Sequence, residues 1–310
     1  MVTIKEESLL LPQLIVSFKD MSRTRLKQYL QSGRILVNGQ SVTRYDHILH
    51  PGDSVEIGSK ELGVTTKRSM VNGQLSIIYE DCHLIVIDKA VGILSMGMSP
   101  RSESVKTMLD DYFDSTRQRC RAHVVHRLDR DTSGLMVYAK SREVQQLFEA
   151  DWKTLVYDRR YVALVEGSMP QQEGTIKSWL TIGKEFVKSS SVDNGGKLAV
   201  THYRVLQHNE ATSLVEARLD TGRKHQIRVH FADLGHPVLG DRKYGVLPLK
   251  GGRGPLWGSR YGFLAERGGL GGEKDSRLML HAYKLCFIHP VTAERLQFDT
   301  PVPQNFLKAL

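Results

Sequence analysis

The feature that most constrains the fold is a series of short apolar runs, typical of β-strands, that begins near residue 75 and continues almost to the C-terminus. Helical stretches between the runs are few, and residues 141–155 (SREVQQLFEADWKTL) are the clearest of them. A doubly wound parallel sheet would need regular alternation of strands and helices, which is missing. We therefore expect an α+β fold with a mixed, mainly antiparallel sheet. The runs are LSIIYED, HLIVIDKA, LMVYAK, YVALVEG, THYRVL, SLVEARL and KLCFIHP.

The first sixty residues have a different composition and predict a small module of their own. Residues 21–45 contain five basic residues and no acid. Within them, SRTRLKQYLQSG predicts a short helix with Ser22 as its N-cap and with Leu26 and Leu30 on one apolar side. The dipeptide Asn38-Gly39 between two apolar stretches is typical of a β-hairpin. A further turn and strand follow in HPGDSVEI.

This arrangement resembles the S4 RNA-binding domain, in which a basic helix is followed by G-x-x-x-VNG and by a closing PGD and strand. The matching pieces are GRILVNG at residues 33–39 and PGD at residues 51–53, and the resemblance covers roughly residues 10–58. It implies that the helix contacts RNA phosphates. Charge alone leaves open a solvated helix face with no ligand. The implied contacts are Arg23, Arg25 and Lys27.

We expect three segments in the chain. An S4-like domain over residues 1–60 is followed by a linker over residues 61–73 and by a larger α+β domain over residues 74–310. A glycine-rich stretch at residues 251–272 is expected to be a surface loop or insertion.

Composition narrows the class of protein. The 43 Lys and Arg residues against 34 Asp and Glu give a net charge of +9, which favours a polyanionic partner such as nucleic acid. The three cysteines lie far apart, so neither a disulfide framework nor a zinc ribbon is encoded. The N-terminus lacks the features of a signal peptide, and no apolar run is long enough for a membrane span. We expect a cytoplasmic protein with no membrane partner.

Motifs for nucleotide, metal or serine-hydrolase chemistry are missing from the sequence. There is no P-loop, no dinucleotide fingerprint and no GxSxG elbow. The histidine pairs 123/126 and 225/230 have no HExxH pattern and no nearby carboxylate at ligand spacing. We expect neither a metal nor a cofactor.

The first informative stretch is AHVVHRLDRDTSGLMVYAK, residues 122–140. Asp129 lies between Arg127 and Arg130, whose charges favour its ionised form. Thr-Ser-Gly predicts a turn before the strand LMVYAK, which would place the acid at the mouth of that strand. A loop acid in such a place is a candidate nucleophile or base. A salt-bridged loop acid with no catalytic role explains the same pattern equally well.

The second informative stretch is residues 217–245, in which Arg223, Lys224 and Arg228 cluster around a His-Gln pair. If this segment is helical, Arg228 and Lys224 share one face, four residues apart. Such a cluster can pair with a carboxylate and with RNA phosphates together. A solvated basic helix is the alternative.

Four motifs in this part of the chain resemble the signatures of the RluA family of pseudouridine synthases, in the family's order. The resemblance spans residues 73–310. One departure is visible, since residues 89–92 read Lys-Ala-Val-Gly where the family commonly has Lys-Pro-x-Gly. The motifs are HRLD-x-x-TSG from residue 126, TGR-x-HQIR-x-H from 221, LGHP-x-x-GD-x-x-YG from 234 and LHAY-x-L-x-F-x-HP from 280.

The resemblance assigns roles to individual residues. Asp129 is implied as the nucleophile that acts on the target uridine, and Tyr161 as the tyrosine that stacks on the flipped base. Arg228 matches the basic residue that pairs with the catalytic carboxylate. Arg127 matches an arginine that enters the RNA stack in place of the extruded base, and Ile227 is implied as an apolar wall of the pocket.

The implied function is isomerisation of specific uridines in RNA, by a monomer without a cofactor. Large-subunit (23S) ribosomal RNA is the first choice, because an S4 module in this family most often accompanies that substrate, and transfer RNA is the second. A non-catalytic RNA-binding or ribosome assembly protein is a further alternative. A hydrolase with Asp129 and Asp131 as paired carboxylates is disfavoured, because neighbouring strand positions point to opposite faces.

Overall fold

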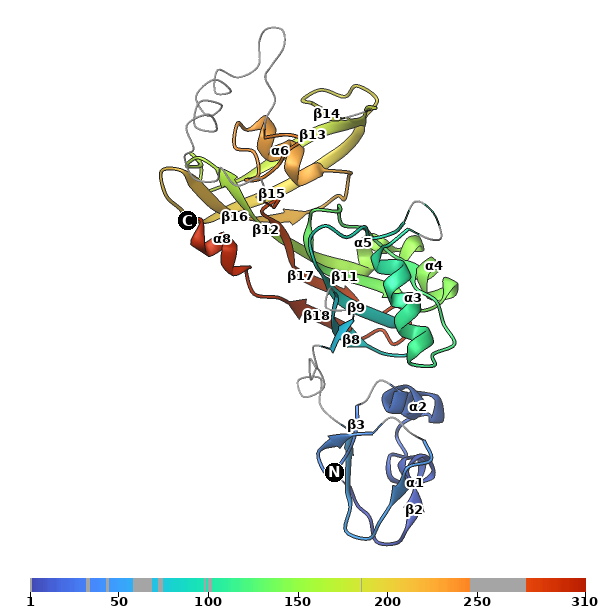
Figure 1. Ribbon diagram of the computed structural model, residues 1–310. Coiled ribbons are helices and arrows are strands. Elements are labelled where there is room, and N and C mark those ends of the chain that lie inside the picture. Colours follow the sequence, from blue (N-terminus) through green and yellow to red (C-terminus); the bar gives the residue numbers. More distant parts are fainter. Residues whose placement is uncertain are drawn as a thin grey trace.

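The computed structural model describes residues 2–31, 34–42, 45–57, 69–71, 75–97, 99, 102–184, 186–245 and 277–310 (Figure 1). The glycine-rich stretch 251–272 lies outside the described residues, as does the expected linker 61–73 apart from residues 69–71.

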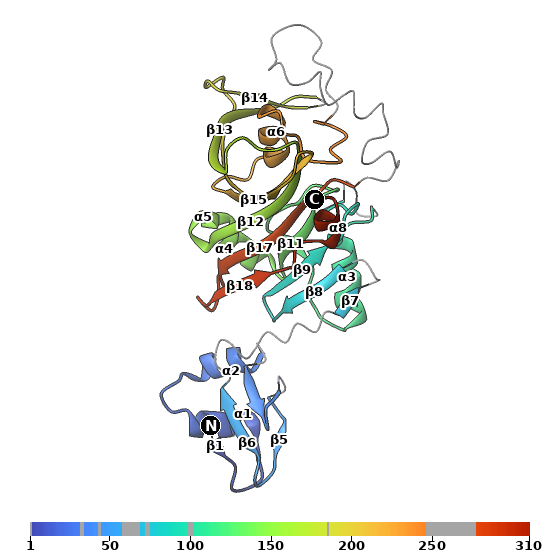
Figure 2. The same cartoon turned by 90° about the vertical axis from the view of Figure 1, so that its left-hand side faces the viewer.

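A small sheet and two helices form the N-terminal module, which Figure 2 shows as a body separate from the large sheet. The sheet has the order β1-β6-β3-β4, and β2 pairs with β5 as a second, two-stranded sheet. An ion pair between Arg34 and Glu294 joins the module to the turn that precedes β18. The elements are β1 (Val2–Thr3), β2 (Ser8–Leu9), α1 (Leu10–Ser17), α2 (Arg23–Gln31), β3 (Ile35–Val37), β4 (Gln40–Ser41), β5 (Ile48–Leu49) and β6 (Ser54–Ile57).

The predicted helix start and hairpin of this module are both confirmed. The Ser22 hydroxyl accepts the backbone N–H of Arg25 at 3.2 Å, as an N-cap does, and Leu26 and Leu30 are buried. Asn38-Gly39 joins β3 to β4 with φ angles of 51° and 75°, the left-handed pair that a type I′ turn requires.

The rest of the described chain forms one twelve-stranded sheet with the order β14-β13-β15-β16-β12-β17-β11-β9-β8-β7, to which β10 and β18 add pairs. Among the described strands, β11 and β17 form the one parallel pair. The expectation of a mixed, mainly antiparallel sheet is therefore confirmed. The strands are β7 (Ser69–Val71), β8 (Leu75–Glu80), β9 (Leu84–Lys89), β10 (His123–Val124), β11 (Ser133–Ala139), β12 (Val156–Glu166), β13 (Glu173–Ile182), β14 (Val187–Ser190), β15 (Lys197–His208), β16 (Thr212–Leu219), β17 (Leu280–Ile288) and β18 (Arg295–Asp299).

Helices cover the sheet at both of its ends. In β9, Ile85 and Ile87 pack in the same core as Phe113 of α3, whereas Leu84 and Val86 pack with α4, so the two helices cover opposite faces. A strand that is covered on both sides is apolar throughout, which explains the continuous run HLIVIDKA. Helix α6 packs on β13, β14 and β15 at the other end. The helices are α3 (Val105–Ser115), α4 (Arg142–Ala150), α5 (Trp152–Leu155), α6 (Gln226–Asp233) and α8 (Gln304–Lys308).

All seven apolar runs are strands, but the sequence interpretation missed several others. Strand β13 was missed because polar residues alternate along it and most of its side chains are at least partly exposed. Strand β7 falls inside the expected linker 61–73 and pairs with β8, so the large sheet begins before residue 74. Among the described residues, no helix is long and apolar enough to cross a membrane.

The turn predicted at Thr-Ser-Gly is wrong by a few residues. The turn spans residues 129–132, where the Thr132 N–H donates to the Asp129 carbonyl, and Ser133 and Gly134 already belong to β11. Gly134 is needed for a different reason. Its φ is +119°, and an added Cβ would collide with the backbone of Ala282 in the parallel partner strand β17.

We predict that Gly134→Ala lowers the free energy of unfolding by about 2–6 kcal/mol, the sum of backbone strain and overpacking. Gly195→Ala is the matched control, because Gly195 also has a positive φ (79°) but has open space around its Cβ position. It should lose only about 1–2 kcal/mol. Urea denaturation measures both, and equal losses would show that the close approach of β11 and β17 does not matter.

Candidate active site

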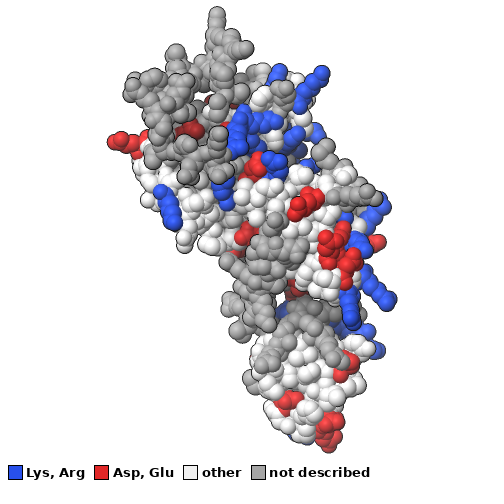
Figure 3. Space-filling model, viewed as in Figure 1, with Lys and Arg blue, Asp and Glu red and all other residues white. Residues whose placement is uncertain are grey.

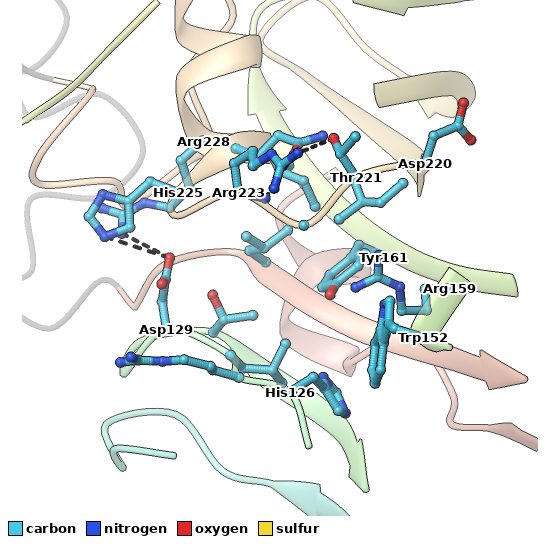
Figure 4. A pocket seen from close by; sticks show the side chains of 18 of the residues that line it. His126, Asp129, Trp152, Arg159, Tyr161, Asp220, Thr221, Arg223, His225 and Arg228 are labelled. Atoms are coloured by element: carbon cyan, nitrogen blue, oxygen red, sulfur yellow. Dashed lines mark hydrogen bonds and ion pairs between the residues drawn. The ribbon is translucent and has the colours of Figure 1, made fainter. Parts of the chain in front are cut away.

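A pocket of about 380 Å³ lies between the segment that leads into β11 and the start of α6 (Figure 4). Its lining comes from four further places: α5, the start of β12, the end of β16 and Leu280 at the start of β17. These segments are far apart in the sequence and meet only because the central strands of the sheet bring them together. The implied residues Arg127, Asp129, Tyr161, Arg223, Ile227 and Arg228 all line the pocket.

Asp129 is presented by a tightly held loop. Ser95 accepts the N–H of Leu128 and donates to its carbonyl, and the buried Lys89 ammonium donates to the carbonyls of Ala90, Ile93 and Arg130. Burial lowers the pKa of Lys89 to about 8. Lys89 therefore organises the segment in which the family's proline is missing. The Asp129 side chain remains 30% exposed, at the pocket wall.

Arg228 binds Asp241 more closely than it binds Asp129, the partner that the resemblance implied. Its Nε and Nη2 donate to the two carboxylate oxygens of Asp241 at 2.7 and 2.8 Å, and the Asp241 side chain is completely buried. The Arg228 Nη1 lies 3.5 Å from Oδ2 of Asp129. Although burial opposes ionisation, the hydrogen bonds and charge of Arg228 hold the pKa of Asp241 below its usual value. Asp241 thus fixes the guanidinium that faces Asp129.

His225 is a second neighbour of Asp129 to which the sequence interpretation gave no role. It precedes α6 in a left-handed conformation with φ 55°, rare for a non-glycine residue, and its Nε2 lies 3.9 Å from Oδ2 of Asp129. Its Nδ1 lies 2.8 Å from the hydroxyl of Tyr244. The sequence signals for Asp241 and Tyr244 were present, as the Asp and Tyr of the GD-x-x-YG motif.

Tyr161 lies deep in the pocket with 7% of its surface exposed. The pairing of β12 with β17 shifts register between Arg160 and Tyr161, and such a bulge re-aims the side chains around it. Burial raises the pKa of Tyr161, so its phenol stays protonated at neutral pH. Within the described part of the chain its hydroxyl makes no hydrogen bond, which leaves it available to a ligand.

The helical face that Lys224 would share with Arg228 in a continuous helix is not formed. Helix α6 begins at Gln226, and the left-handed His225 turns the chain before it, so Lys224 is outside the helix, exposed and absent from the pocket lining. Ile227 is buried and forms an apolar part of the wall. Gln226 is structural, because its amide holds Thr221, Arg223 and the backbone of β15.

Trp152 and Arg159 line the opposite end of the pocket from Asp129 (Figure 4). The Arg159 guanidinium lies over the Trp152 ring at 5.3 Å, and His126 packs on the same ring with centroids 5.4 Å apart. Burial lowers the pKa of His126 to about 3, so this histidine is neutral. Its Nε2 accepts the backbone N–H of Val137, which makes it a structural residue.

The surroundings of the pocket are basic. Five Lys or Arg residues and two Asp residues line it among the described residues, and Arg127 and Arg223 are exposed. Figure 3 shows Lys and Arg side chains gathered beside α6 and along the edge near α3 and α4. In the N-terminal module, Arg23, Arg25 and Lys27 are also exposed, although Arg25 donates to the hydroxyl of Tyr29. Such surfaces suit a phosphate backbone.

Within the described ranges, no group of three or more His, Cys, Asp or Glu side chains is arranged to hold a metal ion. The alternative of paired carboxylates finds no support in the geometry. The Asp131 side chain is 47% exposed, pairs with Arg130 at 3.3 Å and does not line the pocket. Asp129 and Asp131 lie on a turn rather than on a strand. The alternation of side chains between the two faces of a strand therefore does not separate them.

We predict that Asp241→Asn lowers the free energy of unfolding by about 3 kcal/mol, because it leaves the buried Arg228 charge without its carboxylate. Asp299→Asn is the matched control. Asp299 is 47% exposed and pairs with Lys284 at 3.6 Å, a surface contact that contributes at most about 1 kcal/mol. Urea denaturation at pH 7 should separate the two variants. Similar losses in both would contradict the role given to Asp241.

The pH dependence of stability gives a second test of the same pair. The folded-state pKa of Asp241 is lowered, so its stabilisation is fully present above the unfolded value of about 3.9 and is lost as the pH falls through the folded value. The difference in unfolding free energy between the wild type and Asp241→Asn should therefore be constant from pH 7 to about pH 5. It should narrow below about pH 4, and a constant difference down to pH 2 would contradict this account.

The chain is similar to known proteins along most of its length. The sequence model of the RNA pseudouridylate synthase family matches residues 83–233, and that of the S4 domain matches residues 11–55. Ribosomal large subunit pseudouridine synthase D of Vibrio cholerae is 37% identical over 295 residues, which cover 94% of this chain and 86% of the relative. An uncharacterized RNA pseudouridine synthase of Bacillus subtilis, YjbO, is 34% identical over 279 residues, 90% of each chain.

Solved structures support the same fold. Human RNA Pseudouridylate Synthase Domain Containing 4 superposes with a TM-score of 0.58 at 24% identity, over 77% of this chain and 92% of that one. For Human RNA Pseudouridylate Synthase Domain Containing 1 the TM-score is 0.55, also at 24% identity, over 75% and 85%. Because relatives that are 34% and 37% identical match at least 90% of this chain, it belongs to the RluA family of RNA pseudouridine synthases, and it carries an S4 domain at its N-terminus.

Proposed function

We propose that this enzyme isomerises uridine to pseudouridine in large-subunit ribosomal RNA, with Asp129 as its nucleophile. The observation that carries the catalytic part is the juxtaposition of a partly exposed carboxylate, a guanidinium fixed by Asp241 and a buried tyrosine in one basic pocket. The choice of substrate is supported by relatives named ribosomal large subunit pseudouridine synthase D, which match 94% of the chain at 33–37% identity.

The reaction rearranges one nucleotide without a net change of oxidation state. The bond between C1′ of the ribose and N1 of uracil breaks, the uracil turns, and C5 bonds to C1′ in place of N1. The proton on C5 is lost and N1 gains one. These steps require a nucleophile or base at the ribose, a surface that holds the detached base, and a closed pocket.

Asp129 supplies the group that acts on the ribose. A carboxylate can either add to the nucleotide or remove a ribose proton to form a glycal, and Asp129 carries the group that both routes require. Arg228 faces Asp129 at 3.5 Å and cannot turn away without breaking two hydrogen bonds to Asp241. A guanidinium held in this way keeps the carboxylate in position before the substrate binds.

Tyr161 and Arg127 serve the flipped nucleotide. A uridine within an RNA helix must leave its stack, at a cost of a few kcal/mol, before Asp129 can reach it. Tyr161 forms a buried aromatic surface on which the uracil stacks, and Ile227 limits the pocket beside it. The exposed guanidinium of Arg127 at the pocket offsets part of the cost by entering the space that the base leaves.

Basic residues at the surface hold the phosphates without reading the sequence. Arg23, Arg25 and Lys27 on α2, with Arg223 and Lys224 beside the pocket, are the proposed contacts. We propose that the enzyme acts as a monomer in the cytoplasm. Transfer RNA is the second substrate to be tested.

We predict that Asp129→Asn abolishes release of tritium from ribosomal RNA labelled at C5 of uridine, with a loss of at least about 10⁴-fold. Its affinity for the RNA should stay within about twofold of the wild type, since the phosphate contacts are elsewhere. Asp131→Asn is the matched control and should release tritium at the wild-type rate. Turnover by Asp129→Asn would refute the catalytic assignment. Release from transfer RNA alone would refute the choice of substrate.

We predict that replacing Arg23, Arg25 and Lys27 with Gln weakens RNA binding. The rate at which bound RNA is isomerised should stay unchanged. The slope of the logarithm of affinity against the logarithm of salt concentration should become shallower by up to about 2, or roughly 0.7 per lost phosphate contact. Lys19→Gln, at an exposed position between α1 and α2, should leave the slope as it is. An unchanged slope in the triple variant would exclude α2 from the RNA interface.

A further inference from the structure

Two donors converge on the same oxygen of the catalytic carboxylate. Arg228 Nη1 lies 3.5 Å and His225 Nε2 lies 3.9 Å from Oδ2 of Asp129 (Figure 4). Within the described part of the chain, the other oxygen, Oδ1, accepts no hydrogen bond. Contacts of this kind are often long in an enzyme without substrate and shorten when the substrate binds.

Arg228 alone leaves this oxygen incompletely held. Its Nε and Nη2 are both engaged with Asp241, so only Nη1 is directed to Asp129. A carboxylate oxygen accepts two hydrogen bonds, so Oδ2 can take a second donor beside Arg228. His225 Nε2 lies 3.9 Å from this oxygen.

The contacts of Tyr244 favour one position for the proton of His225. The Tyr244 hydroxyl oxygen accepts the backbone N–H of Val187 at 3.1 Å, and burial raises the pKa of Tyr244, so its own proton stays in place. Among the described groups, His225 Nδ1, at 2.8 Å, is an acceptor within reach of that proton. When Nδ1 accepts it, the neutral imidazole has its hydrogen on Nε2, the nitrogen that faces Asp129.

His225 is also held in the neutral form and in place. Burial lowers its pKa despite the opposite effect of the Asp129 charge, and the charges of Arg228, Lys243 and Lys224 add to the lowering. Its left-handed backbone, with φ 55°, is the kind of strained conformation that persists where the surrounding structure fixes a functional residue. The ring packs edge-on against Tyr244, with centroids 5.6 Å apart.

We propose that His225 is a positioning residue for the isomerisation, whose Nε2–H binds Oδ2 of Asp129 together with Arg228 and leaves Oδ1 to meet the ribose. This inference rests on the proposed function of Asp129. His225 does not touch the substrate in this scheme. It reduces the freedom of the carboxylate so that one defined oxygen faces the reacting carbon.

A matched pair of substitutions tests the proposal in the full-length enzyme. His225→Leu removes the donor and puts an apolar side chain of similar length in its place. His225→Gln keeps an N–H donor near the position of Nε2. The measurement is the single-turnover rate of tritium release from C5-labelled large-subunit ribosomal RNA, with the dissociation constant of the same RNA measured in parallel. Thermal melting shows whether each variant is folded.

We expect His225→Leu to lower the single-turnover rate by about 10- to 100-fold, the effect of losing a hydrogen bond to a charged group. Its dissociation constant for the RNA should stay within about twofold of the wild type. His225→Gln should recover the rate to within about fivefold of the wild type. A role that is only structural would not produce this rescue, because both variants lose the imidazole ring and its contact with Tyr244.

Three results would overturn the proposal: a wild-type rate in His225→Leu, equal losses of rate in both variants, or a loss confined to RNA affinity. Asp129→Asn in the same assay distinguishes a failure of the proposed function from a failure of the inference about His225. If Asp129→Asn turns over, the proposed nucleophile is wrong. If Asp129→Asn is inactive and His225→Leu is fully active, only the inference about His225 is wrong.

Discussion

The buried ion pair between Arg228 and Asp241 is the interaction on which the active site depends. Asp241 accepts two hydrogen bonds from the guanidinium and two more from the backbone N–H groups of Lys243 and Tyr244. One carboxylate therefore fixes the arginine that faces Asp129 and the tyrosine that orients His225. Because an unpaired buried charge is strongly destabilising, the geometry of the site and the stability of the fold are linked. Asp241 does this without lining the pocket itself.

The large sheet brings the three implied catalytic residues together from separate elements. Asp129 comes from the turn before β11, Tyr161 from β12 and Arg228 from α6. Strand β17 pairs with both β11 and β12, and Gly134 lets its parallel partner approach closely. A rigid sheet of this kind holds catalytic groups in place before the substrate arrives, which is what electrostatic stabilisation of a developing charge needs. The motifs are dispersed along the chain because the site lies where these elements meet.

Much of the fold could be predicted from the sequence, because its signals are local. Strands that are covered on both faces are apolar throughout, and the cap at Ser22 and the hairpin at Asn38-Gly39 follow from short-range chemistry. Asp129 and Arg228 were candidates from their local sequence, whereas the roles of Tyr161 and Ile227 were inferred only from the family resemblance. The partnership of Arg228 with Asp241 and the displacement of Lys224 from α6 could not be predicted, since they depend on a left-handed residue and on packing between distant segments. Polar strands such as β13 were missed because they contain no apolar run.

A map of pseudouridine in total RNA tests most directly whether this enzyme makes pseudouridine in large-subunit ribosomal RNA. Carbodiimide-dependent stops of reverse transcription would be compared in cells with the gene, without it, and with the gene carrying Asp129→Asn. We expect defined stops in large-subunit ribosomal RNA to disappear without the gene and to stay absent with Asp129→Asn. A map that does not change, or stops lost only from transfer RNA, would contradict it.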